Sequence, residues 1–167
     1  MSQKSYISAQ GVYLGTFINA EPPEGAVEVP QQPFAGSTWD GEAWSVQGPT
    51  GAAINAERDR RLGTTFTFAG KSYDCDTASL ARITGAATLA GFAMGAGAQA
   101  GNLRWHGGAA DFMWIAADNT LTTMDAQTCF AFGNAAATNQ SAHIFAGKAI
   151  KAMDPIPADY TDDKYWP

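Results

Sequence analysis

The stretch TASLARITGAATLAGFAMGAGAQA at residues 77–100 decides the fold expected of this 167-residue chain. Apolar residues recur in it at helical spacing and predict a helix from Asp76 to Gln99 with Asp76 as its N-cap. The opposite side of this helix carries alanine and glycine in place of charge. We therefore expect neighbours on more than one side, with Ala87 and Met94 as packing positions.

The regions on either side of this helix predict a mixed module over residues 52–154. A short helix at 52–62 is stopped by Gly63, and residues 64–74 form a hairpin across Ala69-Gly70. Strands are expected at 103–105, 111–116 and 120–124, and Asp125 caps a last helix that reaches Met153. Its core side is expected to carry Phe130, Ala137, Ile144 and Ile150. The order is α-ββ-α-βββ-α, so the fold class is α+β.

Residues 1–47 are expected to form a small β meander that serves attachment or contact. Short β-rich runs include residues 27–29, and Asp40-Gly41 predicts a two-residue turn between Trp39 and Trp44. A composition break at Gly48-Pro49-Thr50-Gly51 separates this domain from the module. The tail at 155–167 is expected to lie extended on the surface, anchored by Tyr160, Tyr165 and Trp166.

The composition indicates a protein that works within an assembly. The chain is 46% hydrophobic and 16% charged, well below the usual quarter, so some surface is expected to be covered. The net charge of −6 argues against nucleic-acid binding. Glycines interrupt the uncharged stretch 83–103, which argues against membrane insertion, and the N-terminus has no apolar signal core. We expect a soluble protein made in the cytoplasm.

The sequence offers no pattern typical of an enzyme. Cys75 and Cys129 lack metal-site spacing, His106 and His143 are isolated, and the nucleophile-elbow pattern is absent. We expect no metal, no cofactor, no catalytic residue and two free buried thiols. The charged run 57–61 is interpreted as a solvated helix face with local ion pairs, or as a dock for an acidic partner.

The aromatic residues leave two interpretations open. Trp105 and Trp114 are expected in the core. Trp39 and Trp44 form either a small core or, with Asp40, a contact surface on which a sugar can stack.

Several segments resemble an uncharacterised C-terminal domain of tail and tail-fibre proteins of tailed bacteriophages. In residues 52–154 the likeness rests on INAERDRR at 54–61, FTFAG at 66–70, LRWH at 103–106, FMWIAADN at 112–119 and MDAQT at 124–128. GVYLG at 11–15 and WDGEAW at 39–44 are similar to segments that precede this domain.

The resemblance implies a bacteriophage setting. We expect a non-enzymatic structural protein of the virion, at the tail tip or associated with the tail fibre and synthesised in the host cytoplasm. Its partners would be other tail proteins and copies of itself, with a trimer favoured because phage fibres are usually trimeric. The alternatives are a tail-fibre assembly chaperone and a module that binds a host-surface glycan through Trp39, Asp40 and Trp44.

Overall fold

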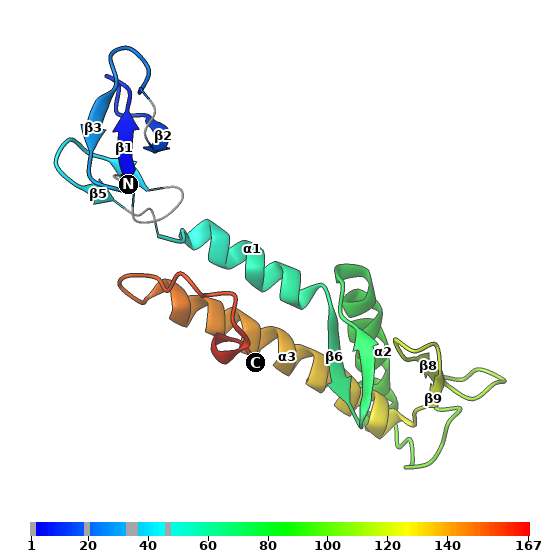
Figure 1. Cartoon of the computed structure of the whole chain (residues 1–167). Helices are drawn as coiled ribbons and strands as arrows, with labels where there is room; N and C mark the ends of the chain where they lie inside the picture. The colour runs from blue at the N-terminus through cyan, green and yellow to red at the C-terminus, as the bar shows by residue number, and fades with distance from the viewer. Residues whose placement is uncertain (1–2, 19–20, 33–36, 46–47) are drawn as a thin grey trace. The chain divides into compact units, whose positions relative to one another are not determined.

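The chain divides into two compact units, Met1–Gly48 and Pro49–Pro167 (Figure 1). The computed structural model describes residues 3–18, 21–32, 37–45 and 48–167. The change in amino-acid composition at residues 48–51 lies at the boundary between these two units. Each unit has its own buried residues and is described by itself.

The first unit contains two small antiparallel sheets. Its three-stranded sheet has the order β2-β1-β3, with β1 (Gln3–Ile7) between β2 (Tyr13–Ile18) and β3 (Val27–Val29). A meander would place β2 in the middle, so the expected strand order is wrong. Tyr6, Ile7 and Val29 are its buried apolar residues among those described.

The second sheet of this unit pairs β4 (Thr38–Trp39) with β5 (Trp44–Ser45). Its loop has four residues, and the expected two-residue turn is wrong. The Asp40 carboxylate accepts hydrogen bonds from the backbone N–H groups of Glu42 and Ala43. An aspartate side chain that satisfies two loop amides stabilises this longer connection.

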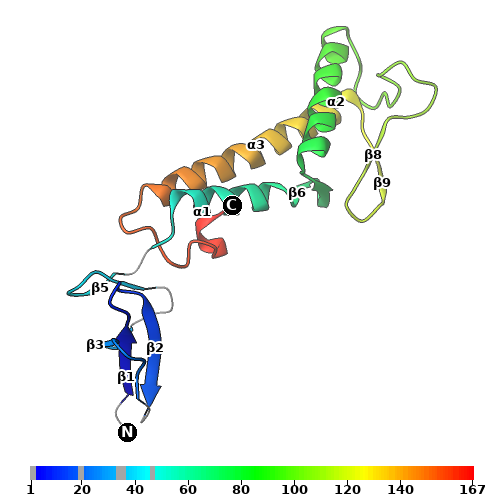
Figure 2. The same ribbon diagram turned by 90° about the horizontal axis from the view of Figure 1, so that it is seen from above.

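The second unit combines helices with two hairpins and confirms the α+β class. Its elements are α1 (Gly51–Leu62), β6 (Thr65–Phe68), β7 (Lys71–Asp74), α2 (Thr77–Gly95), β8 (Met113–Ile115), β9 (Leu121–Thr123), α3 (Ala126–Lys151) and the 3₁₀ helix η1 (Asp163–Tyr165). Figures 1 and 2 show α1 along one half of α3 and α2 near the other end of α3.

Two helix N-termini and one hairpin turn of this unit lie where the sequence predicts them. Asp76 accepts hydrogen bonds from the amides of Ala78 and Ser79, and Asp125 accepts one from the amide of Thr128, so both expected caps are confirmed. The hairpin β6–β7 turns through Ala69-Gly70, with φ angles of 48° and 77°. Positive φ at both turn residues matches the twist of the flanking strands.

Helix α2 ends four residues before the expected Gln99. Gly97 adopts a φ of 94°, the Gly97 amide donates to the Met94 carbonyl, and the Ala98 amide donates to the Ala93 carbonyl. This pair of bonds is a Schellman motif, which satisfies the last carbonyls of a helix and needs a residue at positive φ. Gly97 therefore ends the helix.

The expected strand at 103–105 is absent, and the structure has turns there. The Asn102 side chain accepts a hydrogen bond from the Arg104 amide, which curves the chain, and Gly101 and Gly107 adopt positive φ angles. Trp105 donates its indole N–H to the Met124 carbonyl. It lies half-buried against the core, and so does Trp114, which confirms the expectation for both.

Phe132 of α3 lies at the centre of the main core. Its ring centroid is 5.3 Å from that of Phe66, 4.7 Å from that of Tyr73 and 5.4 Å from that of Trp114. The buried thiols of Cys75 and Cys129 belong to the same core and are free, as expected. Of the four residues expected on the core side of α3, Ile150 alone is buried, while Phe130, Ala137 and Ile144 are exposed.

The C-terminal tail folds back on the unit through turns and η1, so the expected extended path is wrong. Trp166 is buried with Ile54 of α1 and Ile150 of α3, and Tyr160 and Tyr165 pack against them. These three aromatic residues thus hold the tail against α1 and α3.

We predict that residues 49–167 fold without the first unit, because they contain both apolar clusters of the second unit and all its caps. Limited proteolysis of the full chain should cut near residues 46–50 and leave a stable C-terminal fragment. Urea unfolding of the recombinant 49–167 fragment, followed by circular dichroism, should be cooperative. A gradual, non-cooperative loss of helix signal would contradict the boundary.

Candidate functional site

The outward sides of α2 and α3 carry little charge and expose several large apolar side chains. Arg82 is the one charged residue of α2, and α3 has no Asp, Glu, Lys or Arg before Lys148. Phe92 is 73% exposed, Leu89 62% and Phe145 63%. The α2–α3 face, as we call it, consists of Thr84, Thr88, Leu89 and Phe92 with Phe130, Asn134, Ala137, Ser141, Ile144 and Phe145.

The outward sides of the two helices meet along a groove of about 230 Å³. It is lined by Thr84, Ala87 and Thr88 of α2 and by Phe130, Gly133, Asn134 and Ala137 of α3. Phe130, Ala137 and Ile144 follow one another at seven-residue spacing. Such spacing keeps one stripe of a helix directed at a neighbouring helix.

Along this groove, the backbones of α2 and α3 approach each other closely. A Cβ atom built on Gly133 would lie 2.3 Å from the Cβ of Ala87, so no side chain fits between them. Ala87 is half-buried at this contact, and Met94 packs against the main core. The expectation that α2 is covered on more than one side is wrong within a single chain, because Leu89 and Phe92 lie open.

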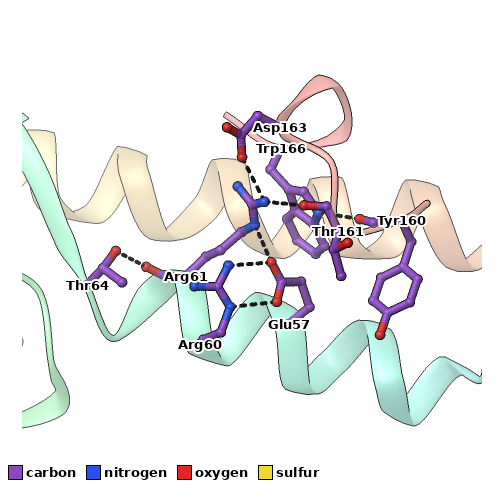
Figure 3. Close-up of polar contacts among 8 residues, drawn as sticks. All are labelled: Glu57, Arg60, Arg61, Thr64, Tyr160, Thr161, Asp163 and Trp166. Atoms are coloured by element: carbon purple, nitrogen blue, oxygen red, sulfur yellow. Dashed lines mark hydrogen bonds and ion pairs between the residues drawn. The ribbon is translucent and has the colours of Figure 1, made fainter.

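A network of charged groups fastens the tail to α1 (Figure 3). Glu57 accepts two hydrogen bonds from Arg60 and one from Arg61, at 2.6–2.7 Å. Arg61 also donates to the carbonyl of Thr161 and to the carboxylate of Asp163. The side chain of Glu57 is only 8% exposed, so the expected solvated face is wrong at this residue.

The electrostatics of this network favour the charged form of Glu57. Hydrogen bonds from Arg60 and then Arg61 hold its pKa at about 2, below the ordinary 4.5, although burial acts in the opposite direction. The Arg61 guanidinium lies 5.3 Å from the ring centroid of Trp166, and the ring of His143 stacks on Trp166 as well. These contacts join the tail to α1 and α3.

The aromatic pair of the first unit behaves as a small core. Trp39 and Trp44 pack edge to face at 5.4 Å, Tyr13 packs on Trp44 at 5.7 Å, and the Trp44 indole donates to the carbonyl of Pro30. Asp40 is occupied by its loop amides, which lower its pKa. Both tryptophans remain half-buried. The geometry favours the core interpretation of this group over the contact surface.

Metal-binding side chains do not gather in the described ranges. Three or more His, Cys, Asp or Glu side chains placed to hold a metal ion occur nowhere in them. Burial raises the pKa of Cys129 to about 11 and also raises that of Cys75, so both thiols stay protonated at neutral pH. Over the same ranges, no helix is long and apolar enough to cross a membrane.

Sequence reasoning missed the outward positions of Leu89, Phe92 and Phe145. The signal that was available is the near absence of charge along both helices, because a solvated helix face normally carries polar or charged residues. It also missed the burial of Glu57 and the role of Arg61, whose partners Thr161 and Asp163 lie about a hundred positions further along the chain. No local pattern marks such a pair.

Comparison with known families gives one result. The profile of a family described as a domain of unknown function (DUF4376) matches residues 46–164. No curated protein and no solved structure matches the chain.

We predict that Gly133→Ala destabilises the second unit by about 1–3 kcal/mol, because the added methyl collides with Ala87 and the helices must separate. The matched control is Gly85→Ala in α2, where an added Cβ meets no atom within 4 Å. It should be neutral or stabilising by about 0.5–1 kcal/mol, since alanine favours a helix interior. Urea unfolding gives the free energy of unfolding of both variants. Equal changes in the two variants would contradict the close contact between Gly133 and Ala87.

We predict that Glu57→Gln lowers the free energy of unfolding by about 1–3 kcal/mol at neutral pH, since the charge-assisted bonds to both arginines weaken. The lowered pKa of Glu57 means that its charge stabilises the fold above about pH 4.5 and stops doing so as the pH falls to about 2. The difference in free energy of unfolding between wild type and variant should therefore shrink as the pH falls from about 4.5 to about 2. A difference that stays constant with pH would contradict the role assigned to the Glu57 charge.

Proposed function

The chain belongs to the DUF4376 family of domains of unknown function, and we propose that it is a non-enzymatic structural protein of a bacteriophage virion. It would be a component of the tail tip or associated with the tail fibre, synthesised in the host cytoplasm. The bacteriophage setting is supported by the sequence resemblance. The structural role is supported by the α2–α3 face.

The exposed apolar surface is the observation that carries the proposal. Phe92, Leu89 and Phe145 lie on helices whose neighbouring outward residues are small or uncharged. Large apolar side chains exposed in such number mark contact sites in soluble proteins.

A second copy of the chain is the partner that the face suits best. The chain carries a net charge of −6, yet this face contains no charged side chain. Two copies that meet here would bury apolar surface without bringing like charges together. A closed symmetric oligomer is the common outcome, with a trimer favoured by the likeness to fibre proteins. A specific contact would bury about 800 Å² per partner.

We predict that the full chain self-associates and that Phe92→Gln and Ile144→Gln each weaken association by about tenfold or more. Both side chains are exposed, so the fold of one chain should not change. Val12→Gln is the matched control, because Val12 is 62% exposed but belongs to the first unit and is not one of the residues of the face. Sedimentation equilibrium over a range of concentrations gives the association constants.

Two outcomes would count against the proposal. If the Val12 and Phe92 variants associate equally strongly, the α2–α3 face does not take part in self-association. Mass spectrometry of purified particles of the phage that encodes the chain separates a virion component from an assembly chaperone. A chain that is monomeric in solution and missing from the particles would contradict the structural role and favour the chaperone.

A further inference from the structure

A cavity of about 390 Å³ lies where β7, the first turns of α2 and the β8–β9 hairpin meet. Asp74 ends β7, Ser79 and Arg82 come from α2, and Trp114 and Asn119 come from the hairpin and its turn. Small-molecule sites typically measure roughly 300–1,000 Å³ and combine an apolar wall with a few converging polar groups. The size and the mixed lining of this cavity meet both conditions.

The polar groups of this cavity have spare hydrogen-bonding capacity. Within the described residues, the side chains of Asp74, Arg82 and Asn119 form no hydrogen bond with another residue, and the charge of Arg82 acts only through space on Asp76, whose pKa it helps to lower. Other carboxylates of this unit, such as Asp76 and Asp118, are occupied by backbone amides or hydroxyls. The groups around the cavity are thus available to a ligand.

We propose that this cavity binds one residue of a neutral sugar. A carboxylate accepts hydrogen bonds from two hydroxyls, a guanidinium donates several in a fixed plane, and an amide does both. Asp74, Arg82 and Asn119 together match a ring that presents hydroxyls in several directions. The half-buried indole of Trp114 supplies an apolar surface for the C–H face of such a ring.

The charges of the lining disfavour ligands that carry a single charge and ligands that are purely apolar. Asp74 repels a phosphate or a carboxylate, and Arg82 repels a cation. A purely apolar ligand would leave both charges without partners and desolvated, which is costly. A nucleotide is disfavoured by Asp74 and by the net charge of −6. A neutral, hydroxyl-rich ligand satisfies both charges.

The walls of the cavity are held in place before any ligand arrives. The Ala117 amide donates to the carbonyl of Ser72, and Lys71 donates to the hydroxyls of Thr120 and Thr122, so the two hairpins are joined. Trp114 is fixed by its packing on Phe132. A preformed site loses little entropy on binding, which favours affinity for a small ligand.

The test uses the full chain and a panel of methyl glycosides of glucose, galactose, mannose, rhamnose and N-acetylglucosamine. Saturation-transfer NMR detects binding, and amide chemical-shift titration of the labelled protein gives the affinity and the site. We expect saturable binding of at least one glycoside, with a Kd on the order of 1 mM. Shifts should be confined to residues of the cavity. Adenosine and inorganic phosphate are the comparison probes.

Asp74→Ala and Arg82→Ala should each weaken binding by about tenfold or more, since each loses hydrogen bonds that involve a charge. Glu24→Ala and Lys148→Ala are matched controls, because both side chains are exposed and lie outside the cavity. Neither control should change the affinity. Circular dichroism of all four variants checks that the fold is intact.

Three results would overturn the proposal: no saturable binding of any glycoside, binding that the Asp74 and Arg82 variants leave unchanged, or tighter binding of adenosine or phosphate. The inference goes beyond the proposed structural role and does not depend on it. Association through the α2–α3 face is measured by sedimentation with other variants, so either idea can fail while the other stands.

Discussion

The packing of Phe132 is the interaction on which the second unit depends. Its ring contacts Phe66 and Tyr73 of the β6–β7 hairpin and Trp114 of β8, so one side chain of α3 joins both hairpins. Because this ring is fixed in the core, the rotation of α3 about its own axis is fixed as well. The residues on the opposite side of α3 must then point outward, whatever their polarity. The exposed position of Phe130 is a consequence of the buried position of Phe132.

Local structure could be predicted from the sequence wherever a short-range signal exists. The caps at Asp76 and Asp125 and the turn at Ala69-Gly70 depend on a few neighbouring residues, and all three occur as expected. The rotation of α3 could not be predicted, because apolar residues occur on both of its sides. With no charged residue before Lys148, neither stripe is marked as the solvated one. The error on Phe130 and Ile144 therefore has the same origin as the candidate interface.

Long-range contacts set the other limit on what the sequence predicts. Arg61 and Asp163 are 102 positions apart and form an ion pair at 2.9 Å. The run at residues 57–61 has the composition of a solvated helix face, yet Glu57 is buried and its partner Arg61 is bound by the tail. The cavity at Asp74 and Arg82 is similar, since its lining comes from β7, α2 and the β8–β9 hairpin. Such a site exists only once the hairpins are joined, so no spacing in the sequence reveals it.

Helix α2 can serve the interface and the cavity at the same time. Nine residues separate Ser79, which lines the cavity, from Thr88, which lines the groove with α3. Nine residues are two and a half turns of an α-helix, so the two side chains lie on opposite sides of α2. A copy of the chain that packs on Thr84 and Thr88 would leave Ser79 open to a ligand, although Leu89 shares one stripe of α2 with Arg82 of the cavity. Each chain of a symmetric oligomer would then present its own cavity, and several weak sugar contacts made together bind far more strongly than one. The same helix would thereby link assembly to recognition, without any change in the fold of the single chain.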